Sequence, residues 1–183
     1  MPEEWVQAIL DTNASRKKGK CGEIKLKSIL KENGFVEVKN WEDFFSQNKC
    51  VVSFSRAFNL KKVRKNLGAR IKTKKQNKTL DLIIKVDDKV FLLEAKHLNT
   101  SGGGQDKQIS ELIEILSLKE SNQKMYYVSF LDGNYSNNIL SEQAGNEKLK
   151  TQRAEIQKHL KQNSNSFWLN TAGFKALFAD LTK

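Results

Sequence analysis

The stretch Thr79-Leu-Asp-Leu-Ile-Ile-Lys-Val86, then Asp87-Asp88, then Lys89-Val-Phe-Leu-Leu-Glu-Ala-Lys96 decides the expected fold. Both outer runs are rich in the branched and aromatic residues that favour strands. The two aspartates between them have the length of a tight hairpin turn. The stretch therefore predicts two antiparallel strands, over Thr79 to Val86 and Lys89 to Lys96.

The hairpin fixes which side chains meet. If Val86 pairs with Lys89, the numbers of paired residues sum to 175, so Asp81 faces Glu94. Their Cα atoms are then roughly 4.5–5.5 Å apart. Because side chains alternate along a strand, Lys96 shares the face of Glu94. Two carboxylates and one ammonium are expected on one face of an otherwise apolar hairpin.

This arrangement points to metal-dependent chemistry. Like charges directly opposite each other destabilise a sheet, and a divalent cation would compensate them. Carboxylate oxygens with few other ligands suit Mg²⁺. A cation on Asp81 and Glu94 would bind a phosphate oxygen and generate hydroxide, while Lys96 would orient the water or stabilise the phosphate charge. The alternative is a plain cross-strand charge cluster on a solvated face.

The same residues resemble a known family. Asp81, a spacer of 12 residues and Glu94-Ala95-Lys96 are similar to the signature of the PD-(D/E)xK nucleases, with Leu80 in place of the usual proline. Glu23 resembles the acidic residue of that family's first helix. The resemblance covers residues 16 to 131. It implies an α/β fold with a restriction-endonuclease-like mixed sheet flanked by helices, metal ligation by Asp81 and Glu94, and catalytic roles for Lys96 and Glu23.

Two longer stretches resemble type II restriction endonucleases. They are Glu94 to Ile109, which holds three consecutive glycines, and Tyr126 to Gly133. The whole chain is similar to the small catalytic subunit of a heterodimeric type IIS enzyme. That resemblance implies cleavage of double-stranded DNA beside a larger recognition subunit; a homodimer is the other expected arrangement. Residues 1–183 are expected to form one nuclease domain.

A basic tract precedes the hairpin. Residues 56–78 hold ten Lys or Arg and no acid, which favours contact with a phosphate backbone over a merely solvated face. Gln105 and Lys107, after the glycines, are also expected to face DNA. The other predicted contacts are Lys61, Lys62, Arg64, Lys65, Arg70, Lys72, Lys74 and Lys75.

Composition narrows the class of protein. The 183 residues include 32 Lys or Arg against 21 Asp or Glu, a net charge of +11 that favours a polyanionic partner. Two cysteines cannot build a disulfide framework or a Cys-rich zinc site. No signal peptide and no transmembrane run is visible, so a cytoplasmic protein is expected.

Hydrophobic periodicity and turn residues predict the remaining elements. The predicted helices cover Pro2 to Leu10, Gly22 to Asn33, Trp41 to Asn48, Asn59 to Asn66, Lys107 to Lys119, Glu147 to Lys161 and Ala172 to Leu181, and the predicted strands cover Met125 to Leu131 and Phe167 to Leu169.

Two other functions fit parts of the pattern. The basic entry Arg16 to Glu23 resembles that of archaeal-type Holliday-junction resolvases, although the long basic insert and the glycines oppose this. A non-enzymatic nucleic-acid-binding protein would carry the carboxylates as surface charge only.

Overall fold

A single mixed sheet organises the chain. The computed structural model describes residues 22–71, 80–99, 103–141 and 146–183, and its six strands lie in sequence order across the sheet. The strands are β1 (Val36–Glu37), β2 (Lys49–Ser53), β3 (Leu82–Val86), β4 (Lys89–His97), β5 (Met125–Asp132) and β6 (Ser166–Leu169). The pairs β2–β3 and β3–β4 are antiparallel, and the pairs β1–β2, β4–β5 and β5–β6 are parallel.

The pairing predicted for the hairpin is confirmed from its turn as far as Leu82 on the first strand. Val86 pairs with Lys89, and the register runs to Leu82 opposite Leu93. Asp87 has φ 52°, a left-handed conformation that aspartate tolerates better than most residues. Strand β3 begins at Leu82 rather than Thr79, and residues 72–79 lie outside the described ranges.

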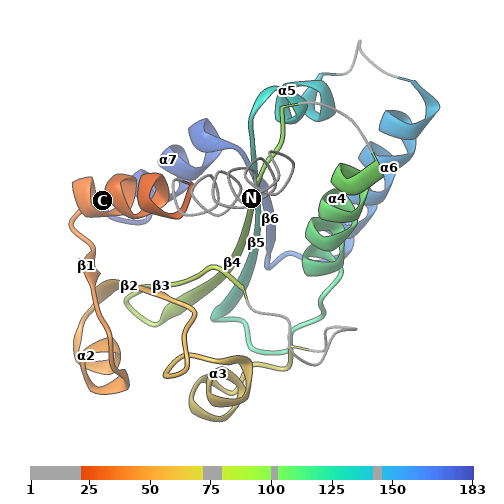
Figure 1. Ribbon diagram of the computed structural model, residues 1–183. Coiled ribbons are helices and arrows are strands. Elements are labelled where there is room, and N and C mark those ends of the chain that lie inside the picture. Colours follow the sequence, from red (N-terminus) through yellow and green to blue (C-terminus); the bar gives the residue numbers. More distant parts are fainter. Residues whose placement is uncertain (1–21, 72–79, 100–102, 142–145) are drawn as a thin grey trace, which may run out of the picture.

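Two helices cover one face of the sheet. They are the helix over residues 22–32 and α7 (Thr171–Asp180), which Figure 1 shows together on one side. Leu26 and Leu30 from the first helix and Phe174 and Phe178 from α7 are fully buried against this face. Their 3–4-residue spacing is the apolar stripe that an amphipathic helix needs.

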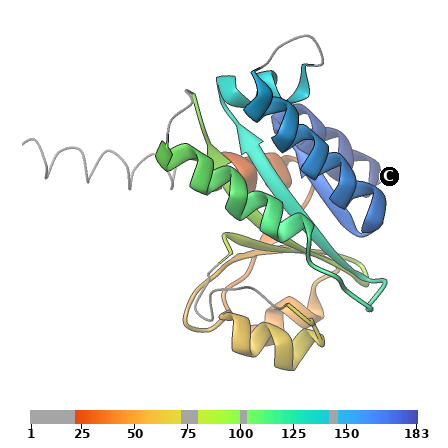
Figure 2. The same cartoon turned by 90° about the vertical axis from the view of Figure 1, so that its right-hand side faces the viewer.

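The opposite face is covered in two parts. Helix α3 (Leu60–Leu67) packs in one buried cluster with Leu80 and Leu92, while α4 (Gly103–Leu116), α5 (Asn134–Leu140) and α6 (Glu147–Gln162) share another. Figure 2 shows α4 running along strand β5, with α3 at the other end of the molecule. The α/β class and the mixed sheet flanked by helices are confirmed.

The prediction missed several elements. Strands β1 and β2 and helix α5 were not expected, although β2 is an interior strand whose run Cys50-Val51-Val52 is fully buried. Helix α2 (Trp41–Ser46) is two residues shorter than expected, and α4 begins at Gly103 instead of Lys107. Helix α3 has Asn59 as its N-cap and Gly68 as its C-cap, close to the expected bounds of Asn59 and Asn66. The expected helix over Pro2 to Leu10 lies outside the described residues.

Candidate active site

The residue directly before strand β3, Asp81, carries the first carboxylate. The Ala95 amide donates to Oδ2 of Asp81 at 2.7 Å, which brings this carboxylate against the backbone of β4. The Asp81 amide donates to the Leu93 carbonyl at 2.9 Å. The expected direct opposition of Asp81 and Glu94 is therefore corrected: the regular ladder ends at Leu82, and the next hydrogen bond is displaced by one residue. The Asp81 carboxylate lies against the Ala95 amide, and its charge and that of Glu94 both act on Lys96.

The second carboxylate and the lysine lie two residues apart on β4. The Lys96 Nζ is 2.6 Å from Oε1 of Glu94, whose side chain is only 4% exposed. Burial would lower the pKa of Lys96, but the charges of Glu94, Asp81 and Glu111 and the hydrogen bond to Glu94 outweigh it and raise the pKa. The lysine is therefore an ammonium held among carboxylates.

A third carboxylate reaches this lysine from helix α4. Oε2 of Glu111 lies 3.5 Å from the Lys96 Nζ, and both side chains are about one-fifth exposed. Hydrophobic patterning did not single out Glu111, because its neighbours Ile109, Leu112 and Ile113 indicate only which face of the helix is buried. The packing of α4 on the sheet brings the Glu111 carboxylate to Lys96.

The donor chemistry fits a hard divalent cation. Asp81 and Glu94 supply carboxylate oxygens at adjacent backbone positions, and Mg²⁺ is commonly bound through one or two carboxylates, with water and phosphate as its other ligands. Within the described ranges, no group of three or more Asp, Glu, His or Cys side chains is arranged to hold a metal by itself. A cation here would rely on water or substrate for its other ligands.

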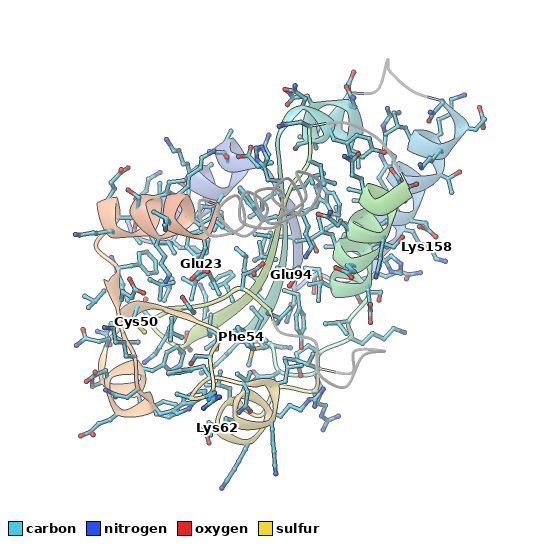
Figure 3. The ribbon with its side chains drawn as sticks, viewed as in Figure 1. Glu23, Cys50, Phe54, Lys62, Glu94 and Lys158 are labelled. Atoms are coloured by element: carbon cyan, nitrogen blue, oxygen red, sulfur yellow. The ribbon has the colours of Figure 1, made fainter. Side chains whose placement is uncertain are left out.

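Glu23 lies on the opposite face of the sheet from Glu94. Its carboxylate accepts a hydrogen bond from the Ser53 hydroxyl and pairs with Lys27 at 3.0 Å. Ser53 pairs with Leu82, whose side chain is buried under the first helix. Figure 3 shows Glu23 by that helix and Glu94 in the sheet. The structure thus brings Glu23 to Ser53 and Lys27, and its catalytic role stays a prediction.

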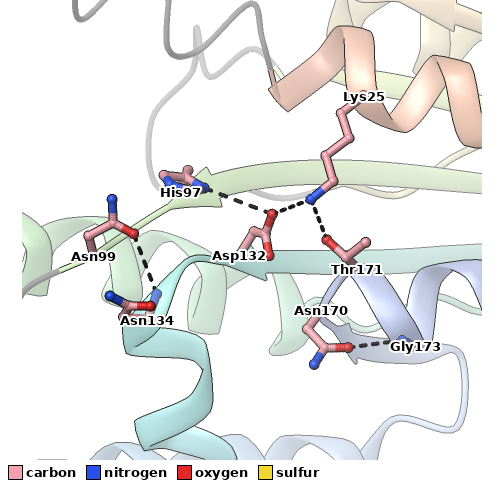
Figure 4. A network of polar contacts seen from close by, with 8 residues as sticks. All are labelled: Lys25, His97, Asn99, Asp132, Asn134, Asn170, Thr171 and Gly173. Carbon is pink, nitrogen blue, oxygen red and sulfur yellow. Dashed lines mark hydrogen bonds and ion pairs between the residues drawn. The ribbon is translucent and has the colours of Figure 1, made fainter.

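A network of polar contacts lies at the carboxyl ends of β4 and β5. His97 pairs with Asp132 in the ladder, and its Nδ1 lies 3.9 Å from the Asp132 carboxylate. The Lys25 ammonium contacts the same carboxylate at 2.8 Å and the Thr171 hydroxyl at 2.9 Å (Figure 4). His97 therefore faces the first helix, on the opposite face of the strand from Lys96, as the alternation of side chains along a strand requires. The network ties the first helix, β5 and α7 together directly beyond the candidate site.

Eight of the ten predicted DNA contacts fall into three groups. Lys61, Lys62 and Lys65 are exposed on α3, whose buried residues share a core with Leu80, next to Asp81. Lys107 is exposed in α4, and Gln105 is partly buried there. Lys72, Lys74 and Lys75 lie outside the described residues.

Two arginines of the basic tract have structural partners. The Arg64 guanidinium donates to the Ile71 carbonyl, at 2.9 Å from Nε. The backbone amide of Arg70 donates to the Glu120 carboxylate at 2.7 Å, and Arg70 is exposed to solvent. Arg64 therefore holds the chain between α3 and residue 72, and its DNA contact stays a prediction.

The helices of the described ranges include none with the length and apolar character that a bilayer crossing requires.

In a comparison with protein-family models, residues 6–167 match DpnII restriction endonuclease. Searches of curated proteins and of solved structures found no match.

Proposed function

Because the chain belongs to the DpnII restriction endonuclease family, we propose that Asp81, Glu94 and Lys96 are its active site for cleaving double-stranded DNA. The family makes the chain a restriction endonuclease, a hydrolase of DNA. The observation that supports this assignment is that the Asp81 carboxylate, which precedes β3, contacts β4 at Ala95, between Glu94 and Lys96, and that both carboxylates act on the Lys96 ammonium.

We propose Mg²⁺ as the cofactor, with Asp81 and Glu94 as the protein ligands. When bound, the cation would polarise a phosphodiester oxygen and lower the pKa of a water molecule for attack on phosphorus. Lys96 stays protonated and donates hydrogen bonds, so its role is to hold the attacking water or a phosphate oxygen. The Ala95 amide fixes the Asp81 carboxylate in the orientation that ligation needs.

The exposed lysines of α3 are proposed to hold the phosphate backbone of the substrate. Lys61, Lys62 and Lys65 follow the Asn59 cap on a helix with no acid in its first turn, and Arg70 and Lys107 extend the basic surface. Such contacts position DNA and are sensitive to salt. Lys72, Lys74, Lys75 and Gln105 belong to the same proposal.

One catalytic site cuts one strand at a time, and a second site would cut the other strand in the same complex. We propose that it comes from a larger recognition subunit, as in the type IIS enzymes that the sequence resembles, or from a second copy of this chain. The products distinguish the cases. Nicked circles from supercoiled plasmid indicate cutting of one strand, and linear DNA indicates cutting of both.

The test compares two aspartates of one hairpin. Asp81→Asn removes a charge but keeps an oxygen that can accept the Ala95 amide, so we expect the fold to persist and cleavage in Mg²⁺ to fall by about 100-fold or more. Asp88→Asn is the matched control, because Asp88 is exposed at the turn and its carboxylate forms a surface ion pair with Lys124, away from Asp81. Asp88→Asn should cut at the wild-type rate.

Plasmid cleavage is measured for the wild type in Mg²⁺ and in EDTA, and for both variants in Mg²⁺. Cleavage by Asp81→Asn at the wild-type rate would refute the site. If the chain alone leaves duplex DNA intact, a four-way junction is the second substrate, since preferential junction cutting would indicate a resolvase. Salt-sensitive binding with no cutting of either substrate would leave only the non-enzymatic function for the isolated chain.

A further inference from the structure

We propose that Glu111 of α4 is a positioning residue that takes over the Lys96 ammonium when a divalent cation binds at Glu94. This inference rests on the function proposed above, and it assigns a role in the site to a helix that carries none of the proposed catalytic residues.

The lysine already lies between the two carboxylates. Its Nζ is 2.6 Å from Glu94 and 3.5 Å from Glu111, so it bonds the first and stands within ion-pair distance of the second. The Glu94 side chain is almost fully buried, whereas Glu111 is 23% exposed. A small movement of a flexible lysine toward the more open side exchanges one partner for the other.

Electrostatics gives a reason for the exchange. The oxygen of Glu94 that holds Lys96 is also a hard donor for a divalent cation, and a cation there repels the ammonium. An ammonium that left Glu94 without a new partner would lose its compensation in a partly buried position, which is costly. Glu111 supplies that compensation and keeps the lysine near the phosphate.

The fold holds Glu111 in place. Ser129 pairs with Glu94 in the sheet, and its buried hydroxyl donates to the carbonyl of Leu112 at 2.7 Å. Leu112 and Leu116 are fully buried beneath the same helix. The residue next to Glu111 is thus bonded to the strand residue beside Glu94, so the distance between the two glutamates is set by the packing of α4.

A double-mutant cycle on cation affinity tests the exchange without relying on cleavage. Mg²⁺ is titrated calorimetrically into the wild type, Lys96→Met, Glu111→Gln and the double variant, all without DNA. In the wild-type background, Glu111→Gln should weaken Mg²⁺ binding by about tenfold, because Lys96 then keeps competing for Glu94. In the Lys96→Met background the same change should alter affinity by about twofold or less.

Two further variants make the result specific. Glu114→Gln removes the same charge one turn along α4, in the groove that Glu111 also lines, and should leave both affinity and cleavage within about twofold of the wild type. Glu111→Asp keeps the charge and should recover most of the Mg²⁺ affinity. Where cleavage is measurable, Glu111→Gln at saturating Mg²⁺ should lower kcat about tenfold with KM nearly unchanged, since no substrate contact is lost.

Equal effects of Glu111→Gln with and without Lys96 would overturn the exchange, because they would mean that Glu111 acts only as a distant charge. If Asp81→Asn abolishes Mg²⁺ binding while that equality holds, the proposed active site stands and the role of Glu111 falls. If the wild type binds no Mg²⁺, or Asp81→Asn binds it as tightly, both fall together.

Discussion

Replacing Gly133 with alanine should destabilise the end of the sheet that follows the candidate site. Gly133 has φ 92° and ψ 178°, a region that is essentially restricted to glycine. A Cβ there would lie under 3.0 Å from the Leu98 carbonyl oxygen and 2.8 Å from Oδ1 of Asn99. Both contacts are too short, and the nearer one is with backbone, so the chain itself must move.

The magnitude follows from two costs. The backbone conformation costs about 1–3 kcal/mol for a residue with a side chain. The forced shift adds about 1–3 kcal/mol, as overpacking commonly does. The sum is about 2–6 kcal/mol, and each kcal/mol lowers Tm by about 2–4 °C in a chain of this size. We expect a loss of about 10 °C in Tm.

The displaced segment also bears on cleavage. Leu98 lies two residues beyond Lys96. Its carbonyl accepts a hydrogen bond from the Tyr135 amide, and its amide donates to the Asp132 carbonyl. A shift here should reduce cleavage below the melting temperature as well.

Gly68→Ala is the control for Gly133→Ala. Gly68 also has a positive φ, 69°, but a Cβ added at Gly68 would have no atom of the described residues within 4 Å. Only the conformational cost of about 1–2 kcal/mol applies, so Tm should fall by about 2–8 °C. The measurement is thermal unfolding by circular dichroism. Equal losses in the two variants would refute the close approach between Gly133 and Leu98.

Two further predictions concern titratable groups. Burial opposes ionisation of Asp132, but hydrogen bonds from Lys25, the Gly133 amide and Thr171 and the Lys25 charge prevail and lower its pKa. The lowered pKa stabilises the folded state at pH values above the ordinary carboxyl pKa, and this stabilisation is lost as the pH falls through the folded-state pKa. Asp132→Asn should therefore lose less stability than the wild type below about pH 4. Urea titrations in which both proteins lose stability equally at acid pH would contradict this. Burial raises the pKa of the Cys50 thiol to about 11, so a thiol reagent at pH 8 should label Cys50 only when the protein unfolds. Rapid labelling of Cys50 in the native protein would contradict its burial.

Much of the hairpin could be predicted because its determinants are local. Alternation and the length of the Asp87-Asp88 turn fix the register, which the structure follows from Val86 to Leu82. The break at Asp81 could not be predicted, because it depends on residues distant in sequence. The Phe54 amide donates to the Asp81 carbonyl, so the residue directly after strand β2 also holds the backbone at the end of the ladder.

The contact between Glu111 and Lys96 could not be predicted for a different reason. The 17-residue separation of Glu111 from Glu94 carries no signal, and the contact with Lys96 exists only because β4 and β5 are parallel neighbours and α4 packs on them. Glu23 shows the converse. The position on the first helix was correctly identified as helical, but which face of the sheet its carboxylate reaches is set by Ser53 on the unexpected strand β2.

The two charge features of the chain act at different distances. A net charge of +11 attracts a polyanion over long range, whereas Asp81, Glu94 and Glu111 set three carboxylates around the single ammonium of Lys96. At physiological ionic strength, exposed charges are screened beyond about 8 Å, whereas charges in a partly buried site are screened much less. A basic surface can therefore attract DNA while the carboxylates of the proposed site attract the proposed divalent cation. It follows that salt should weaken DNA binding far more than it weakens Mg²⁺ binding.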